Sequence, residues 1–185
     1  MSDSDLVMAM PRRELYKVSG FTRAIDYAVL ESLDGEHWFS APGILRDNPD
    51  AKEVRLGLIA LRSAESDQVL IEERGVLLHA APIPPEAAQF GAGLRALREL
   101  ARAAAGQLLG CEVGVIELLG YLNDDALAEC RDAFILVYQA QVRADLAAPE
   151  GMSWVGLDHL HEVALDPVSS LVTPVVERKI AKKHD

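Results

Sequence analysis

Residues 98–106 read Arg-Glu-Leu-Ala-Arg-Ala-Ala-Ala-Gly, and they lie in the clearest helical pattern of the chain. Apolar residues recur around them at the spacing of one helix face. These are Leu94, Leu97, Ala101, Ala104 and Leu108. Pro85 suits the start of such a helix, and Gly110 suits its end. The pattern predicts a helix over 86–109 that carries the charged residues of the stretch.

Apolar runs on both sides of this helix predict strands, two before it and three after it. The expected strands are 54–61, 68–72, 112–122, 133–142 and 153–155. A last helix is expected from Pro167 to about Lys183, because Asp166 suits its N-cap and proline suits its first position. Strands that alternate with helices in this way predict an α/β fold.

The first 53 residues follow a different pattern. Residues 1–12 are expected to form a disordered polar tail, and 13–53 a small β-rich segment. Short strands are expected in that segment over 15–18, 24–30 and 37–39, with a turn at Asp34-Gly35 before the last of them. A homodimer that pairs through this segment is a hypothesis.

The net charge of the 185 residues is −11 at pH 7, which argues against binding to nucleic acid or to an anionic membrane. No apolar run is long enough to span a bilayer, and the N-terminus lacks the pattern of a secretory signal. The two cysteines, Cys111 and Cys130, form neither a metal-binding pair nor a disulfide framework. We therefore expect a cytoplasmic protein.

Three stretches of the chain together resemble the Nudix hydrolase family. Residues 54–73 look like the opening hairpin of that fold, and 97–106 look like the Arg-Glu-apolar part of the Nudix box. Residues 153–158 look like the late strand and turn beside the substrate site. The resemblance implies an α/β/α sandwich around a mixed sheet, formed by a domain over 54–185 and preceded by the β-rich segment.

The box itself departs from the family pattern, G-x5-E-x7-R-E-U-x-E-E-x-G-U, in which U is apolar. When Arg98 and Glu99 are placed on its Arg-Glu pair, Arg102 and Ala103 stand where two metal-binding glutamates belong. Nudix hydrolysis needs Mg²⁺ or Mn²⁺ held by clustered carboxylates. One helical glutamate cannot supply that cluster, so the stretch looks like a catalytic helix that has lost most of its carboxylates.

The resemblance nevertheless implies candidate site residues. Glu99 is the candidate catalytic residue and metal ligand, and Asp124 and Asp125 would complete a cation site from a loop. Arg102 and Arg98 are candidates for binding phosphate. Trp154 is the candidate for stacking on a substrate.

Each of these residues also has an ordinary structural interpretation. Glu99 would then pair with an arginine one helical turn away. Asn-Asp-Asp at 123–125 is common turn chemistry, and a tryptophan such as Trp154 most often packs in a core. Neither interpretation is decided by the sequence.

Two classes of function follow from these observations. The first is binding or hydrolysis of a nucleoside diphosphate-linked compound, with Mg²⁺ or Mn²⁺ as cofactor if the protein is active. A cation site rebuilt from loop carboxylates would allow the hydrolysis. The second class is a non-catalytic interaction or regulatory protein that has kept only the Nudix scaffold.

Overall fold

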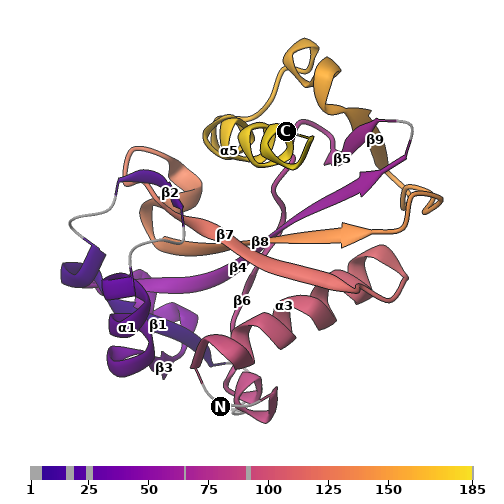
Figure 1. Cartoon of the computed structure of the whole chain (residues 1–185). Coiled ribbons are helices and arrows are strands. Elements are labelled where there is room, and N and C mark those ends of the chain that lie inside the picture. Colours follow the sequence, from indigo (N-terminus) through magenta and orange to yellow (C-terminus); the bar gives the residue numbers. More distant parts are fainter. Residues whose placement is uncertain (1–5, 16–18, 24–26, 65, 91–92, 185) are drawn as a thin grey trace.

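A computed structural model describes residues 6–15, 19–23, 27–64, 66–90 and 93–184 (Figure 1). The described strands are β1 (Val7–Pro11), β2 (Gly20–Arg23), β3 (Trp38–Ser40), β4 (Ala51–Ser63), β5 (Asp67–Glu72), β6 (Leu78–Pro82), β7 (Val115–Asn123), β8 (Ala133–Val142) and β9 (Met152–Gly156). The α-helices are α1 (Tyr27–Glu36), α2 (Pro42–Arg46), α3 (Gly93–Leu109), α4 (Ala128–Arg131) and α5 (Pro167–His184). Short 3-10 helices are η2 (Arg12–Leu15), η3 (Pro85–Phe90) and η4 (Leu157–Glu162).

The strands form one mixed sheet around the pair β4 and β8. These two strands run parallel and stay in register from Glu53 opposite Ala133 to Arg62 opposite Val142. β1 and β3 extend the sheet beyond β4, while β7 and β2 extend it beyond β8. β5 and β6 also pair with β4, and β9 pairs with β5. The two central strands are almost wholly buried, as is usual for parallel strands covered on both faces.

Side chains of the central strands alternate between two apolar clusters, one on each face. Leu56 and Leu136 belong to the cluster under α1 and α3, whereas Ile59 and Ile135 belong to the cluster under α5. Figure 1 shows α3 and α5 on opposite sides of the sheet. The expected α/β/α sandwich around a mixed sheet is confirmed.

One glycine is required by a close approach between strands. A side-chain carbon at Gly120 in β7 would collide with the backbone oxygen of Thr22 in the neighbouring β2. The register of β7 against β8 also shifts between Leu118 and Gly120. The N-terminal segment therefore reaches the β7 edge of the sheet only because position 120 has no side chain.

The N-terminal segment differs from the sequence prediction in two places. Residues 7–11, expected in the disordered tail, form β1, whose side chains from Val7 to Met10 are buried. Residues 27–36, expected as part of a strand and a turn, form α1, which buries Val29, Leu30 and Leu33. In α1, tertiary burial of these apolar residues decides the local structure against their strand-like composition.

Other sequence predictions for this segment fare differently. The strand expected over 37–39 corresponds to β3, one residue later. Residues 16–18 and 24–26 lie outside the described residues.

The last helix, α5, begins as expected, because the Asp166 carboxylate accepts a hydrogen bond of 2.8 Å from the backbone N–H of Ser169. No helix in the described part of the chain is long and apolar enough to cross a membrane.

Two isoleucines, one buried in the sheet core and one exposed, allow the contribution of the core to stability to be tested. Ile59 in β4 is fully buried, whereas Ile44 in α2 is 62% exposed. We expect Ile59→Ala to lower the free energy of unfolding by about 2–5 kcal/mol, because it leaves a cavity between sheet and α5. Ile44→Ala should change it by about 0.5 kcal/mol or less. Urea denaturation of both variants measures the difference; equal values would contradict the two-layer core.

Candidate functional site

Helix α3 presents the Arg-Glu-Leu stretch beside the sheet. Its buried face, which includes Leu97, Ala101 and Ala105, packs in the cluster under the helix. Glu99 lies on the flank of the helix, and its side chain keeps 32% of its exposure. Its carboxylate pairs with Arg102 at 3.1 Å and with Arg98 at 3.5 Å. The expected pairing of Glu99 with an arginine one turn along is thus present.

The Arg102 guanidinium makes further contacts beyond Glu99. Its Nη1 donates to the backbone oxygen of Val113 at 3.0 Å and also to that of Gly114. These carbonyls lie in the connection between α3 and β7. Arg102 therefore joins the helical carboxylate to the following loop and brings a positive charge to the place where the box pattern expects a carboxylate.

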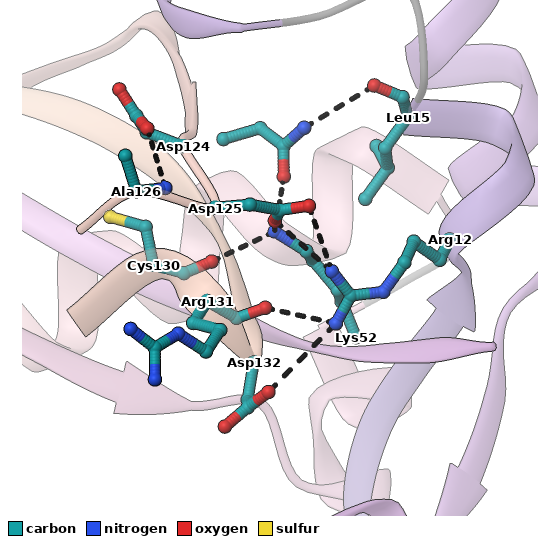
Figure 2. Close-up of polar contacts among 10 residues, drawn as sticks. Arg12, Leu15, Lys52, Asp124, Asp125, Ala126, Cys130, Arg131 and Asp132 are labelled. Carbon is teal, nitrogen blue, oxygen red and sulfur yellow. Dashed lines mark hydrogen bonds and ion pairs between the residues drawn. The ribbon is translucent and has the colours of Figure 1, made fainter. Parts of the chain in front are cut away.

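Asp125 is engaged in a separate polar cluster at the far end of β7 (Figure 2). Its Oδ1 accepts a hydrogen bond of 2.5 Å from Lys52 Nζ, and Lys52 also donates to Asn123 Oδ1 at 2.6 Å. The third acceptor is the backbone oxygen of Cys130 at 2.8 Å. The Lys52 side chain is fully buried, so these three acceptors replace the water that its ammonium would otherwise bind.

Arg12 closes this cluster from the N-terminal segment. Its guanidinium binds both carboxylate oxygens of Asp125 at 3.0 Å and the backbone oxygen of Arg131 at 2.9 Å. Chiefly through the hydrogen bond from Lys52, these neighbours hold the pKa of Asp125 below its ordinary value. The Asp125 carboxylate is thus already surrounded by two cationic groups.

Asp124 has a local role. Its Oδ1 accepts a hydrogen bond of 2.9 Å from the backbone N–H of Ala126, which is the turn chemistry that the sequence allows. Among the described residues, no group of three or more histidine, cysteine, aspartate or glutamate side chains is arranged to hold a metal ion. The described structure therefore does not bring Glu99 together with Asp124 and Asp125.

Trp154 lies in β9, and its indole packs against the cluster under α3. The Arg62 guanidinium lies over its ring, 4.6 Å from the ring centroid. Arg62 is itself held by Gln68 Oε1 at 2.6 Å and by the backbone oxygen of Leu146 at 2.5 Å. One face of the indole is therefore covered by a fixed cation rather than open to a substrate.

A groove of about 480 Å³ runs between the first turns of α3 and the strands β7 and β8. It is lined by Leu94, Arg95, Arg98, Ile116, Glu117, Leu118 and Tyr138. Burial raises the pKa of Tyr138, so its phenol stays protonated. Arg98 was expected from the sequence. Arg95 and Tyr138 were not assigned to a site, because only the packing of α3 on β7 and β8 brings them beside Arg98.

No protein-family model matches the chain, and no curated protein matches it either. The search of solved structures does find matches. The crystal structure of Tm1382, which is assigned to the Nudix hydrolases, superposes with a TM-score of 0.74 at 15% identity. The match covers 92% of this chain and 97% of that one. This chain has the Nudix fold.

Two other Nudix structures match less well. The Nudix domain of Shewanella oneidensis NrtR, solved in complex with ADP ribose, has a TM-score of 0.49 at 12% identity and covers 76% of this chain and 99% of its own. RenU, a Nudix hydrolase from M. smegmatis, has a TM-score of 0.40 at 18% identity and covers 70% of this chain and 87% of its own.

The Nudix fold implies a divalent cation, and the residues around Glu99 do not fit one. Mg²⁺ prefers several oxygen ligands in octahedral geometry. Near Glu99 the described structure instead offers the guanidinium groups of Arg98 and Arg102, which donate hydrogen bonds and cannot coordinate a cation. We therefore assign no reaction step to a metal at this helix.

The Lys52 cluster predicts a pH-dependent stability. We expect Asp125→Asn to lower the free energy of unfolding near neutral pH by about 1–2 kcal/mol, a modest loss because the aspartate itself is 60% exposed. Since the folded pKa of Asp125 is lowered, the carboxylate stabilises the fold fully above its ordinary pKa of about 3.9. This contribution is lost as the pH falls through the lowered folded pKa.

Urea denaturation of both proteins from about pH 6 to about pH 3 tests this expectation. The difference between them should shrink on acidification. Asp47→Asn, at an exposed position in the N-terminal segment, is the control and should show almost no difference at any pH. A difference for Asp125→Asn that does not change with pH would contradict the assigned role.

The register of the box can be tested by restoring its carboxylates. We expect Mn²⁺ to leave the melting temperature of the natural protein unchanged, and to raise that of an Arg102→Glu/Ala103→Glu double variant. Because Ala103 is exposed, this variant would place three glutamates, at 99, 102 and 103, on one flank of α3. Carboxylate oxygens are the ligands that such cations prefer, and a bound cation stabilises the fold. Adding Glu99→Gln should remove the response. Stabilisation of the natural protein by Mn²⁺ would contradict the proposed geometry.

Proposed function

We propose that this protein binds a nucleoside diphosphate-linked compound in the groove between α3 and β7, without a divalent cation and without hydrolysing it. The observation that carries the proposal is the pair Arg95 and Arg98, which line that groove one helical turn apart. Guanidinium groups in such a pair suit the oxygens of a diphosphate, because each can donate two parallel hydrogen bonds.

The charge of the whole chain makes this pair distinctive. The net charge of the chain is −11, whereas the charged residues that line the groove are two arginines and one glutamate, Glu117. Arg98 lies 3.5 Å from the Glu99 carboxylate, a contact that leaves its other donors for a ligand. The apolar side chains of Ile116 and Leu118 at the groove would exclude water from one side of that ligand.

Binding without hydrolysis is supported by Arg102. Hydrolysis of a diphosphate linkage requires a group that neutralises the phosphates and activates water, which a divalent cation supplies in this fold. Arg102 can neutralise charge but cannot lower the pKa of a bound water as a metal does. Arg102 also pairs with Glu99, which is the one helical carboxylate of the box. The hydrogen bond from Arg102 to the backbone oxygen of Val113 holds the guanidinium in that position.

We also propose that the protein is cytoplasmic and forms a homodimer. Both cysteines are free thiols, and burial raises the pKa of Cys130 to about 11, so this thiol is unreactive near neutral pH. Such cysteines are compatible with a reducing compartment. The homodimer through the N-terminal strands stays a prediction.

Thermal melting against a panel of diphosphate compounds tests the proposal. The panel contains nucleoside diphosphates, ADP-ribose, dinucleotides and sugar nucleotides, each with and without Mg²⁺. A ligand at about a hundred times its Kd should stabilise the fold by about 2.7 kcal/mol, with no need for the cation. Arg95→Gln and Arg98→Gln should each reduce the shift, because each removes a phosphate contact.

Arg46→Gln in α2 is the matched control, since Arg46 is exposed and does not line the groove. It should keep the full shift. A shift that requires Mg²⁺ would favour a hydrolase with a rebuilt cation site instead. No shift with any compound would favour a protein whose function lies in contacts with other proteins.

A further inference from the structure

A second cavity, of about 330 Å³, lies between the N-terminal segment and the start of α3. Its walls come from β1, α1, β3, η3 and α3, and they include Met8, Leu33, Asp34, His37, Phe39 and Leu94. Most of these side chains are apolar. The volume is of the size that accommodates a small planar ring system.

This cavity is a neighbour of the arginine groove. Leu94 lines both. Successive residues of a helix are turned by about 100°, so Leu97 lies on one side of Leu94 and Arg98 on the other. Leu97 lines the cavity, whereas Arg98 lines the groove. The two spaces therefore flank one turn of α3 and share a single side chain as their common wall.

Two polar side chains, Asp34 and His37, lie at the cavity. A side-chain carbon at Gly93 would lie 2.6 Å from Asp34 Oδ1, so the carboxylate of this exposed aspartate lies against the first residue of α3. His37 Nδ1 is 2.7 Å from the backbone oxygen of Leu33, which can only accept. Nδ1 therefore donates in this contact.

We propose that this cavity receives the base of the nucleotide whose phosphates lie at Arg95 and Arg98, and that it selects guanine. The proposal rests on the proposed nucleotide binding. Guanine presents an N1–H and an N2 amino group side by side, which match the two oxygens of the Asp34 carboxylate. Adenine presents an acceptor, its N1, at the corresponding place, which faces the carboxylate unfavourably.

Selectivity of this kind follows from unpaired polar groups. A base that offers an acceptor to a carboxylate leaves both groups without a partner, and that is penalised more than a missing contact is. Because Asp34 is exposed and His37 is half-buried, water weakens the discrimination. We expect GDP to bind about tenfold more tightly than ADP, with IDP, which lacks the N2 amino group, between them.

Calorimetric titration of GDP, IDP, ADP and inorganic diphosphate tests the proposal, because inorganic diphosphate probes the arginine groove alone. Asp34→Asn should bring the affinities for GDP and ADP close together and leave that for inorganic diphosphate unchanged. Asp47→Asn, the exposed control in the same segment, should keep the tenfold preference. Ala96→Leu, which fills the cavity from α3, should weaken GDP but not inorganic diphosphate.

The outcomes separate this proposal from the one on which it rests. If GDP and ADP bind equally well to the natural protein, the guanine site is wrong while nucleotide binding at the arginines stands. If inorganic diphosphate binds and neither nucleotide binds more tightly, the cavity takes no base. If none of the four ligands binds, the guanine site is overturned, and nucleotide binding at the arginines is overturned as well when the wider panel of ADP-ribose, dinucleotides and sugar nucleotides also fails.

Discussion

A lysine ammonium that is fully removed from water must have acceptors around it, and this requirement organises one end of the sheet. Lys52 in β4 takes its acceptors from Asn123, Asp125 and Cys130, which belong to the end of β7 and the connection that leads to β8. Asn123 in turn donates to the backbone oxygen of Leu15, and Arg12 binds the same aspartate. The N-terminal segment and the central strands are therefore joined by one polar cluster, in which loss of any partner leaves a buried charge less well satisfied.

In the candidate site, too, protein acceptors surround a cationic side chain, which is that of Arg102. In a metal-dependent Nudix site, carboxylates would hold a cation that binds the phosphates, whereas here a guanidinium is built into the helix. Arg102 uses its charge on Glu99 and its other donors on the loop after α3. A guanidinium is planar and carries no exchangeable water, so it suits recognition and structural support better than hydrolysis. Arg102, at the position where the box pattern has a glutamate, thus supplies an internal cation for Glu99.

Much of the architecture could be predicted from the sequence, because it depends on local patterns. The apolar runs of β4 and β8 correspond to buried strands, and Leu97 and Ala101 of the predicted stripe lie on the buried face of α3. The other three stripe residues, Leu94, Ala104 and Leu108, are partly buried against the same cluster. The N-terminal segment could not be predicted in the same way. Val29 and Leu30 suit a strand by composition, yet they form a helix because Leu33, one turn later, completes a buried face.

The site could be predicted only in part, for a related reason. Arg98, Glu99 and Arg102 were visible because they are close in the sequence and match part of a known pattern. Lys52 gave no signal, since a lysine is ordinarily exposed and its three acceptors lie 71 to 78 positions away. Asp125 was visible as a carboxylate, but its two cationic partners come from elements whose positions only the folded sheet defines.

The parallel pairing of β4 with β8 also bears on how the chain reaches its fold. Glu53 and its partner Ala133 are about 80 residues apart, so the central pair cannot form on a ribosome until most of the chain has emerged. Until then the apolar β4 can pair only with its antiparallel neighbours, which are β1, β5 and β6. During synthesis β4 therefore waits for its parallel partner, and we expect this long-range pairing to form late in folding.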